Sequence, residues 1–118
     1  EIAYYESPST GTEKYHKFSS WSPLVCTDGV LAFAQEHKAF WALDVVASYA
    51  KWLRDYTRKT SNRFFVLTFD VKDQKCIFRV REDTGTATLI QQRISYTDLQ
   101  VSVKWYFIDG VVLFPSEY

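Results

Sequence analysis

Apolar residues recur every three or four positions through much of the first half of the chain, a spacing that predicts helices. The longest run predicts one amphipathic helix over residues 39–59. Its apolar side consists of Trp41, Val45, Tyr49, Trp52 and Tyr56. Asp44 falls on the opposite, polar stripe with Ser48 and Lys51, so we expect its carboxylate to face water.

A shorter helix is expected upstream, beginning at Thr27 and reaching about Lys38. Thr27 is a good N-cap residue, and Asp28 places a negative charge near the positive end of the helix dipole. Residues 14–26 predict only a short helical turn or irregular chain, because Pro23 interrupts them. Residues 1–13 contain turn-forming residues, and we expect a loose N-terminal arm there, followed by a single domain over residues 14–118.

The second half of the chain alternates apolar and polar residues, which predicts strands. Two-residue turns are expected at Asp73-Gln74 and at Asp109-Gly110, where glycine tolerates the positive φ of a type I′ turn. A further strand is expected between the two hairpins, over residues 86–95. The residue pairs that would face each other are Val71 and Cys76, Phe69 and Phe78, Leu67 and Val80, Phe107 and Val112, and Trp105 and Phe114.

Two helices followed by about five tightly connected strands predict an α+β domain, with the helices packed on an antiparallel sheet in a meander. A chain of 118 residues can bury one core of this kind. Aromatic residues make up 18% of the chain. Such a share either fills the core or leaves aromatic surface for a partner.

Fourteen basic residues balance fourteen acidic ones, so the chain lacks the overall positive charge typical of non-specific nucleic-acid binders. No long apolar stretch or signal-peptide pattern is present, and we expect a cytoplasmic protein without a membrane anchor. The two cysteines, Cys26 and Cys76, are far apart and outside any metal-binding motif. We therefore expect reduced thiols, no metal and no cofactor.

Cys26 is the one candidate nucleophile, because it lies just before a predicted helix N-terminus. His16 or His37 would then be the base. No protease or hydrolase motif surrounds this cysteine, and free cysteines are usually buried, so we favour a structural role for it. We expect no catalytic residue.

A second candidate site lies on the side of the predicted sheet that faces away from the core. Sheet faces with basic and aromatic groups can stack single-stranded bases. The alternative is an ordinary solvated face with surface salt bridges. The candidate binding residues on this face are Arg79, Arg81, Lys104 and Tyr106.

Four blocks of the chain resemble a family of small bacterial proteins known only as a domain of unknown function, often encoded near phage and plasmid genes. The blocks are TDGV (27–30), FWALDVVAS (40–48), ISYTDL (94–99) and LFPSEY (113–118). The resemblance implies a bacterial, cytosolic protein that is complete in itself, and it implies no activity. It also draws attention to polar residues that border apolar runs, for which we expect structural roles as links between elements: Asp44, Asp98, Glu117 and Tyr118.

Together these features favour a non-enzymatic interaction or regulatory module with an unidentified protein partner, and the resemblance suggests a link to mobile elements. The first alternative is a nucleic-acid-binding protein that uses the open sheet face. The second is a small enzyme whose site is assembled from scattered residues. Exposed sheet edges and leftover apolar residues such as Phe64 and Val111 also suggest a homodimer.

Overall fold

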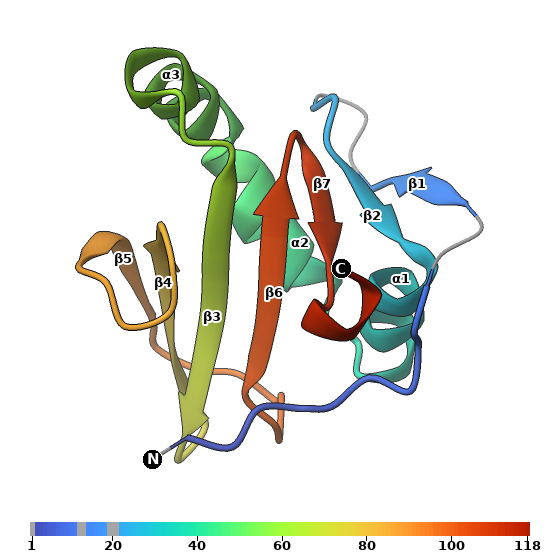
Figure 1. The fold of residues 1–118 in the computed structure, drawn as a ribbon. Coiled ribbons are helices and arrows are strands. Elements are labelled where there is room, and N and C mark those ends of the chain that lie inside the picture. Colours follow the sequence, from blue (N-terminus) through green and yellow to red (C-terminus); the bar gives the residue numbers. More distant parts are fainter. Residues whose placement is uncertain (1, 12–13, 19–21) are drawn as a thin grey trace.

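The computed structural model describes residues 2–11, 14–18 and 22–118, which form an α+β domain around one mixed sheet (Figure 1). The helices in this part of the chain are α1 (Asp28–Glu36), α2 (Phe40–Ser48), α3 (Ala50–Thr60) and the short 3₁₀ helix η1 (Pro115–Glu117). The strands are β1 (Tyr15–Lys17), β2 (Val25–Thr27), β3 (Phe64–Lys72), β4 (Lys75–Arg81), β5 (Thr88–Ile94), β6 (Val103–Ile108) and β7 (Val111–Leu113). Their order across the sheet is β1-β2-β7-β6-β3-β4-β5.

The predicted arrangement of two helices on a five-stranded antiparallel meander is wrong. The described residues form three α-helices and a sheet of seven strands. The sheet is mixed, because β2 runs parallel to β7. It is not a meander either, since β6 pairs with β3 and not with the preceding strand β5.

The helix predicted over residues 39–59 is in fact two helices, α2 and α3, that meet at Tyr49. The Tyr49 N–H donates to the carbonyl of Val46 at 3.0 Å, a tighter turn than that of an α-helix. The Tyr49 hydroxyl donates to Gln92 of β5 at 2.7 Å, and its ring stacks on Phe78 of β4. These contacts hold the bend against the sheet. The apolar spacing continues through the bend, which is why the sequence does not reveal it.

Helix α1 begins as predicted. Thr27 is its N-cap, and the Thr27 hydroxyl oxygen accepts the N–H of Val30 at 3.3 Å. The helix ends at Glu36, just before Lys38 adopts a positive φ of 53°. The N-cap therefore fixes the point at which β2 passes directly into α1.

Both predicted hairpins are confirmed. Asp73 and Gln74 have positive φ, as do Asp109 and Gly110, and these turns join β3 to β4 and β6 to β7. The predicted pairing of Trp105 with Phe114 is not formed, because β7 ends at Leu113. The confirmed facing pairs are Val71 and Cys76, Phe69 and Phe78, Leu67 and Val80, and Phe107 and Val112.

The chain between β5 and β6 explains the unexpected strand order. Residues 95–102 pass the lower end of β3 in Figure 1, near the β3–β4 turn. They bring β6 to the side of β3 that β4 leaves free. Leu99 in this crossing is buried, and the N–H of Thr97 donates to the carbonyl of Gln74 at 2.8 Å. Placing β6 there puts Trp105 directly beside Leu67 in the core.

Strands β1 and β2 lie mostly within residues 14–26, where the sequence predicted a helical turn or irregular chain, and β2 continues to Thr27. His16 pairs with Cys26 between β1 and β2, and Cys26 pairs with Val112 of β7. Each strand is three residues long, so too few positions alternate for the period to be visible. β2 also pairs with β7, which lies more than eighty residues further along the chain.

The core lies between the helices and one face of the sheet, and it contains much of the aromatic content of the chain. The largest buried side chains include Phe33 of α1, Leu43 of α2 and Trp105 of β6. Helix α3 is less involved, because Leu53 is its one buried residue. No helix in the described part of the chain combines the length and the apolar character needed to cross a membrane.

The described part of the predicted N-terminal arm, residues 2–11, follows the surface of the domain (Figure 1). Tyr4 forms a parallel bridge with Ser102, and the N–H of Tyr5 donates to the Ser102 carbonyl at 2.8 Å. The ring of Tyr5 packs against Phe33 and Phe114. Residues 1, 12 and 13 of this arm lie outside the described residues.

Candidate functional site

The open face of the sheet, meaning the side of β3–β6 that points away from the helices, brings together the four residues that the sequence singled out for binding. Thr68 of β3 pairs with Arg79 on one side and with Lys104 on the other. Two positions along β3, Val66 pairs with Arg81 and with Tyr106. Residues two apart on a strand point to the same side. The four candidates therefore form two neighbouring rows across β4, β3 and β6.

Basic residues far outnumber acidic ones on the open face. Alternation along β3–β6, all of which the structure describes, leaves Asp70 as their one carboxylate on this side. The chain as a whole is neutral, so this positive charge is a local feature that total composition conceals. The six cations on this side are Lys72, Lys75, Arg79, Arg81, Arg93 and Lys104.

Asp70 is already engaged by its neighbours. The Arg79 guanidinium donates to Asp70 Oδ2 at 2.7 Å, and the Tyr4 hydroxyl donates to Asp70 Oδ1 at 2.7 Å. Burial, and then the hydrogen bond to Asp70, raise the pKa of Tyr4 to about 12. Arg79 is therefore largely neutralised, and Tyr4 stays protonated over the ordinary pH range.

Two central cations have no carboxylate partner among the described residues. The Arg81 guanidinium donates to the hydroxyl of Thr68 at 3.3 Å. The Lys104 ammonium lies 5.0 Å from the ring centre of Tyr4, a cation–π contact. Both groups keep donors for an anion, since a guanidinium has five N–H groups and an ammonium three.

Three further aromatic rings cluster on the same face as these cations. Tyr106 lies between Phe64 and Tyr118, with centroid distances of 4.9 Å and 5.7 Å. Tyr118 is 79% exposed, so most of its ring is open to solvent. The open face thus combines aromatic surface with positive charge.

A cleft of about 580 Å³, called the α3 cleft below, lies between α3, the β6–β7 turn and residues 22–24. Its floor is apolar and buried, formed by Leu24, Ala47, Leu53 and Phe107, none of them more than 6% exposed. Its rim is mainly basic, with Asp109 as the one carboxylate in the lining, and its cations are Lys51, Arg54, Arg58 and Arg63. The sequence analysis did not identify this site, although Lys51, Arg54 and Arg58 recur at the spacing of one helix side.

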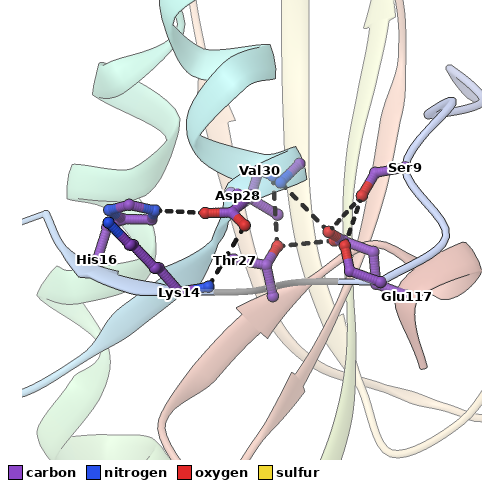
Figure 2. Close-up of polar contacts among 9 residues, drawn as sticks. Ser9, Lys14, His16, Thr27, Asp28, Val30 and Glu117 are labelled. Atoms are coloured by element: carbon purple, nitrogen blue, oxygen red, sulfur yellow. Dashed lines mark hydrogen bonds and ion pairs between the residues drawn. The ribbon is translucent and has the colours of Figure 1, made fainter.

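Glu117 in η1 joins the end of the chain to the start of α1 (Figure 2). Its Oε1 accepts the Thr27 hydroxyl at 2.7 Å and the Phe114 N–H at 2.9 Å. Its Oε2 accepts the Ser9 hydroxyl at 2.9 Å and the Gly29 N–H at 3.2 Å. The four hydrogen bonds of Glu117 thus link the N-terminal segment, the end of β2, the start of α1 and the N-cap of η1.

The other acids suspected of structural roles have fewer partners. Asp44 on α2 is exposed and makes no hydrogen bond or ion pair with the described residues. Asp98 is also exposed, and it accepts the hydroxyl of Tyr96, two residues away, at 2.6 Å. Tyr118 packs on Phe64 and Tyr106 of the open face.

Cys26, the candidate nucleophile, is fully buried. Burial above all, and then the charges of Glu117 and Asp28, raise its pKa to about 12. His16 faces Cys26 across β1 and β2, but its Nε2 lies 2.6 Å from an Asp28 oxygen (Figure 2). Since the thiolate is the reactive form, this environment opposes nucleophilic chemistry at Cys26.

His37, the other histidine, lies half-buried beyond the end of α1. Its ring stacks on Phe33 at a centroid distance of 4.4 Å, with the edge of Tyr5 against it. Its buried Nε2 has no hydrogen-bond partner among the described residues. Nor do three or more His, Cys, Asp or Glu side chains in the described ranges gather into a cluster that could hold a metal ion.

Comparison with known proteins finds one family. The model of DUF6876, described as a family of unknown function, matches residues 7–118. No curated protein and no solved structure matches the chain.

Proposed function

Because this chain belongs to DUF6876, a family of unknown function, we propose its role from its own surface: it is a binding module that holds single-stranded nucleic acid on the open face of its sheet. The observation that carries the proposal is the pair of rows through Thr68 and Val66, which join Arg79, Arg81, Lys104 and Tyr106 across three strands. This clustering favours nucleic-acid binding over the protein-interaction role that the sequence favours.

The charge of the open face supports an anionic ligand. Six cations and one carboxylate project from β3–β6, and that carboxylate, Asp70, is held by Arg79 and Tyr4. A face with several well-spaced cations suits a polyanion better than a compact anion. Neighbouring strands are about 4.8 Å apart and alternate residues about 7 Å apart, so successive phosphates could each meet a different cation.

The aromatic rings support a single-stranded ligand. Bases stack on aromatic side chains only where they are unpaired, and every base has a face that can stack. Tyr118 is the most exposed of the rings, and it lies beside Tyr106. Phosphates on Arg81 and Lys104, with a base on Tyr118, would use both properties of the face.

The test is fluorescence anisotropy with labelled oligothymidylate, oligouridylate and a duplex of equal length. We expect the single strands to bind more tightly than the duplex, and binding to weaken as salt rises. The double variant R81Q/K104Q should weaken binding about tenfold, or ~1.4 kcal/mol. Tyr118→Ala should cost about 1–3 kcal/mol, the range for one stacked base.

The matched control is K17Q/K59Q, which removes two exposed cations from β1 and α3, away from the open face. It changes the net charge by the same amount and should leave binding within about twofold, which corresponds to ~0.4 kcal/mol. Equal losses in both double variants would mean diffuse attraction and no site. Duplex binding as tight as single-strand binding would remove the stacking role.

Interaction with a protein partner is the second candidate function. The α3 cleft favours it, because a cavity of about 580 Å³ there combines an apolar lining with a mainly basic rim. The cleft and the open face share no lining residue with each other, so the two functions can be tested separately.

A further inference from the structure

We infer that the α3 cleft binds an acidic amphipathic segment of a partner protein, whose apolar side chains enter the cleft while its carboxylates meet the basic rim. This inference rests on the protein-interaction role and not on nucleic-acid binding, so either one can fail alone. Its basis is the combination of shape, burial and charge at one place.

The floor of the cleft suits apolar side chains. Leu53 of α3 and Phe107 of β6 lie at its bottom and are at most 5% exposed, whereas Pro23 and Ala50 add more accessible apolar surface to its walls. The volume of about 580 Å³ lies within the range of ligand sites and can take more than one large side chain. A purely polar anion would leave this floor in contact with water.

The rim suits several carboxylates in a row. Lys51, Arg54 and Arg58 follow one side of α3 over roughly 10 Å, given a rise of about 1.5 Å per residue. Arg63 adds a cation on the strand side of the cleft. A compact anion would reach one or two of these groups, whereas a segment with spaced acids reaches them all. The rim therefore favours an elongated ligand.

The rim cations are only weakly engaged within the described chain. Lys51 pairs with Asp55 at 2.9 Å, and Arg63 with Asp109 at 3.4 Å, but these pairs are exposed. Arg58 has no carboxylate within 4 Å among the described residues. Exposed ion pairs contribute about 0–1 kcal/mol, so an acidic ligand can replace them at small cost.

The probe is a short fluorescent peptide in which glutamates alternate with leucines. Two comparison peptides carry either serine in place of leucine or glutamine in place of glutamate. Anisotropy should show saturable binding of the first peptide, with each comparison peptide at least about tenfold weaker. Unlabelled laurate serves as a competitor, to test whether a small amphipathic anion fills the same cleft.

Two variants locate the binding on the cleft. R54Q/R58Q removes exposed rim cations, and Ala50→Leu narrows the cleft at a half-buried lining residue while it keeps every charge. Each should weaken the Glu/Leu peptide about tenfold, and thermal melts should show that both variants stay folded. K17Q/K59Q, the same matched control as above, should bind the peptide like the unmodified protein.

Several results would overturn the inference. Equal binding of the serine peptide would mean that the floor plays no part, and equal loss in K17Q/K59Q would mean attraction without a site. Binding unaffected by both R54Q/R58Q and Ala50→Leu would place the peptide elsewhere. Saturable laurate binding without peptide binding would assign the cleft to a small molecule. None of these results bears on oligothymidylate binding by the open face.

Discussion

The side chain of Glu117 closes directly over Gly29 in the first turn of α1. Its Oε2 accepts the Gly29 N–H at 3.2 Å, and a Cβ atom added at Gly29 would lie only 2.6 Å from that oxygen. The absence of a side chain at residue 29 is therefore what allows the carboxylate to reach the helix N-terminus. A carboxylate there satisfies a free backbone donor and lies at the positive end of the helix dipole.

Gly29→Ala should destabilise the protein by about 1–3 kcal/mol, the cost of leaving a buried polar group without its partner. The new methyl group would displace Glu117, whose other three bonds resist the movement. Urea unfolding followed by fluorescence would measure the change. Gly11→Ala is the control, because a Cβ there meets no atom within 4 Å. A loss below about 0.5 kcal/mol at Gly29 would show that the carboxylate moves freely.

Glu117→Gln should cost a similar amount, about 1–3 kcal/mol. The amide has one acceptor oxygen, and its NH₂ group would face either the N–H of Gly29 or that of Phe114. Combined with Gly29→Ala, the loss should be less than the sum of the two, since both changes break the same contact. Fully additive free energies of unfolding would contradict a direct link between the two residues.

Neither cysteine should react with a thiol reagent in the folded protein at pH 8. Burial raises the pKa of Cys26 to about 12 and that of Cys76 to about 11, so both stay protonated and covered. Release of thionitrobenzoate should therefore begin only when denaturant is added. Rapid labelling of the native protein at Cys26 would reopen the case for a nucleophile.

The same thiol should make the protein less stable in alkali. The pKa of Cys26 is higher in the folded state, so the unfolded thiol loses its proton first as pH rises above about 9. The stability that the protonated Cys26 thiol contributes is fully present below about pH 9. It is lost progressively as the pH rises from about 9 to about 12. Cys26→Ala should flatten the fall in melting temperature over this window. An unchanged slope would show that Cys26 does not contribute.

Asp70→Asn should strengthen the binding of oligothymidylate, the opposite direction to R81Q/K104Q. The change removes the one carboxylate of the open face and frees Arg79 for a phosphate. One added phosphate contact on a single strand makes the slope of log K against log salt concentration steeper by about 0.7. At 0.1 M salt this corresponds to an affinity about fivefold higher. Asp44→Asn is the matched control, with the same change of charge at an exposed residue of α2. An equal gain in both variants would mean that only net charge matters.

Local pattern was sufficient for the elements whose partners are close in sequence. The turn at Asp73-Gln74 and the alternation beside it predicted the β3–β4 register, and Asp109-Gly110 did the same for β6–β7. Thr27 predicted the start of α1. In each case the residues that determine the geometry lie within a few positions of one another, so their preferences can be read directly.

The candidate site was predictable only in part. Alternation placed Arg79 and Arg81 on one side of a strand, and Lys104 with Tyr106 on one side of another. That the two strands lie on either side of β3 was not visible, because nothing in residues 95–102 indicates which strand β6 will pair with. The α3 cleft was missed for a related reason, since its lining comes from α2, α3, β6 and residues 22–24.

The sequence by itself determined the α+β composition, the two hairpins, the N-cap of α1 and the sides of the strands on which charges lie. Only the tertiary structure decided that β6 joins β3, that β2 runs parallel to β7, that the helix bends at Tyr49 and that Glu117 reaches Gly29. The first group depends on steric and hydrogen-bond preferences within a few residues. The second depends on contacts between distant segments, whose free energy exists only once the core has formed.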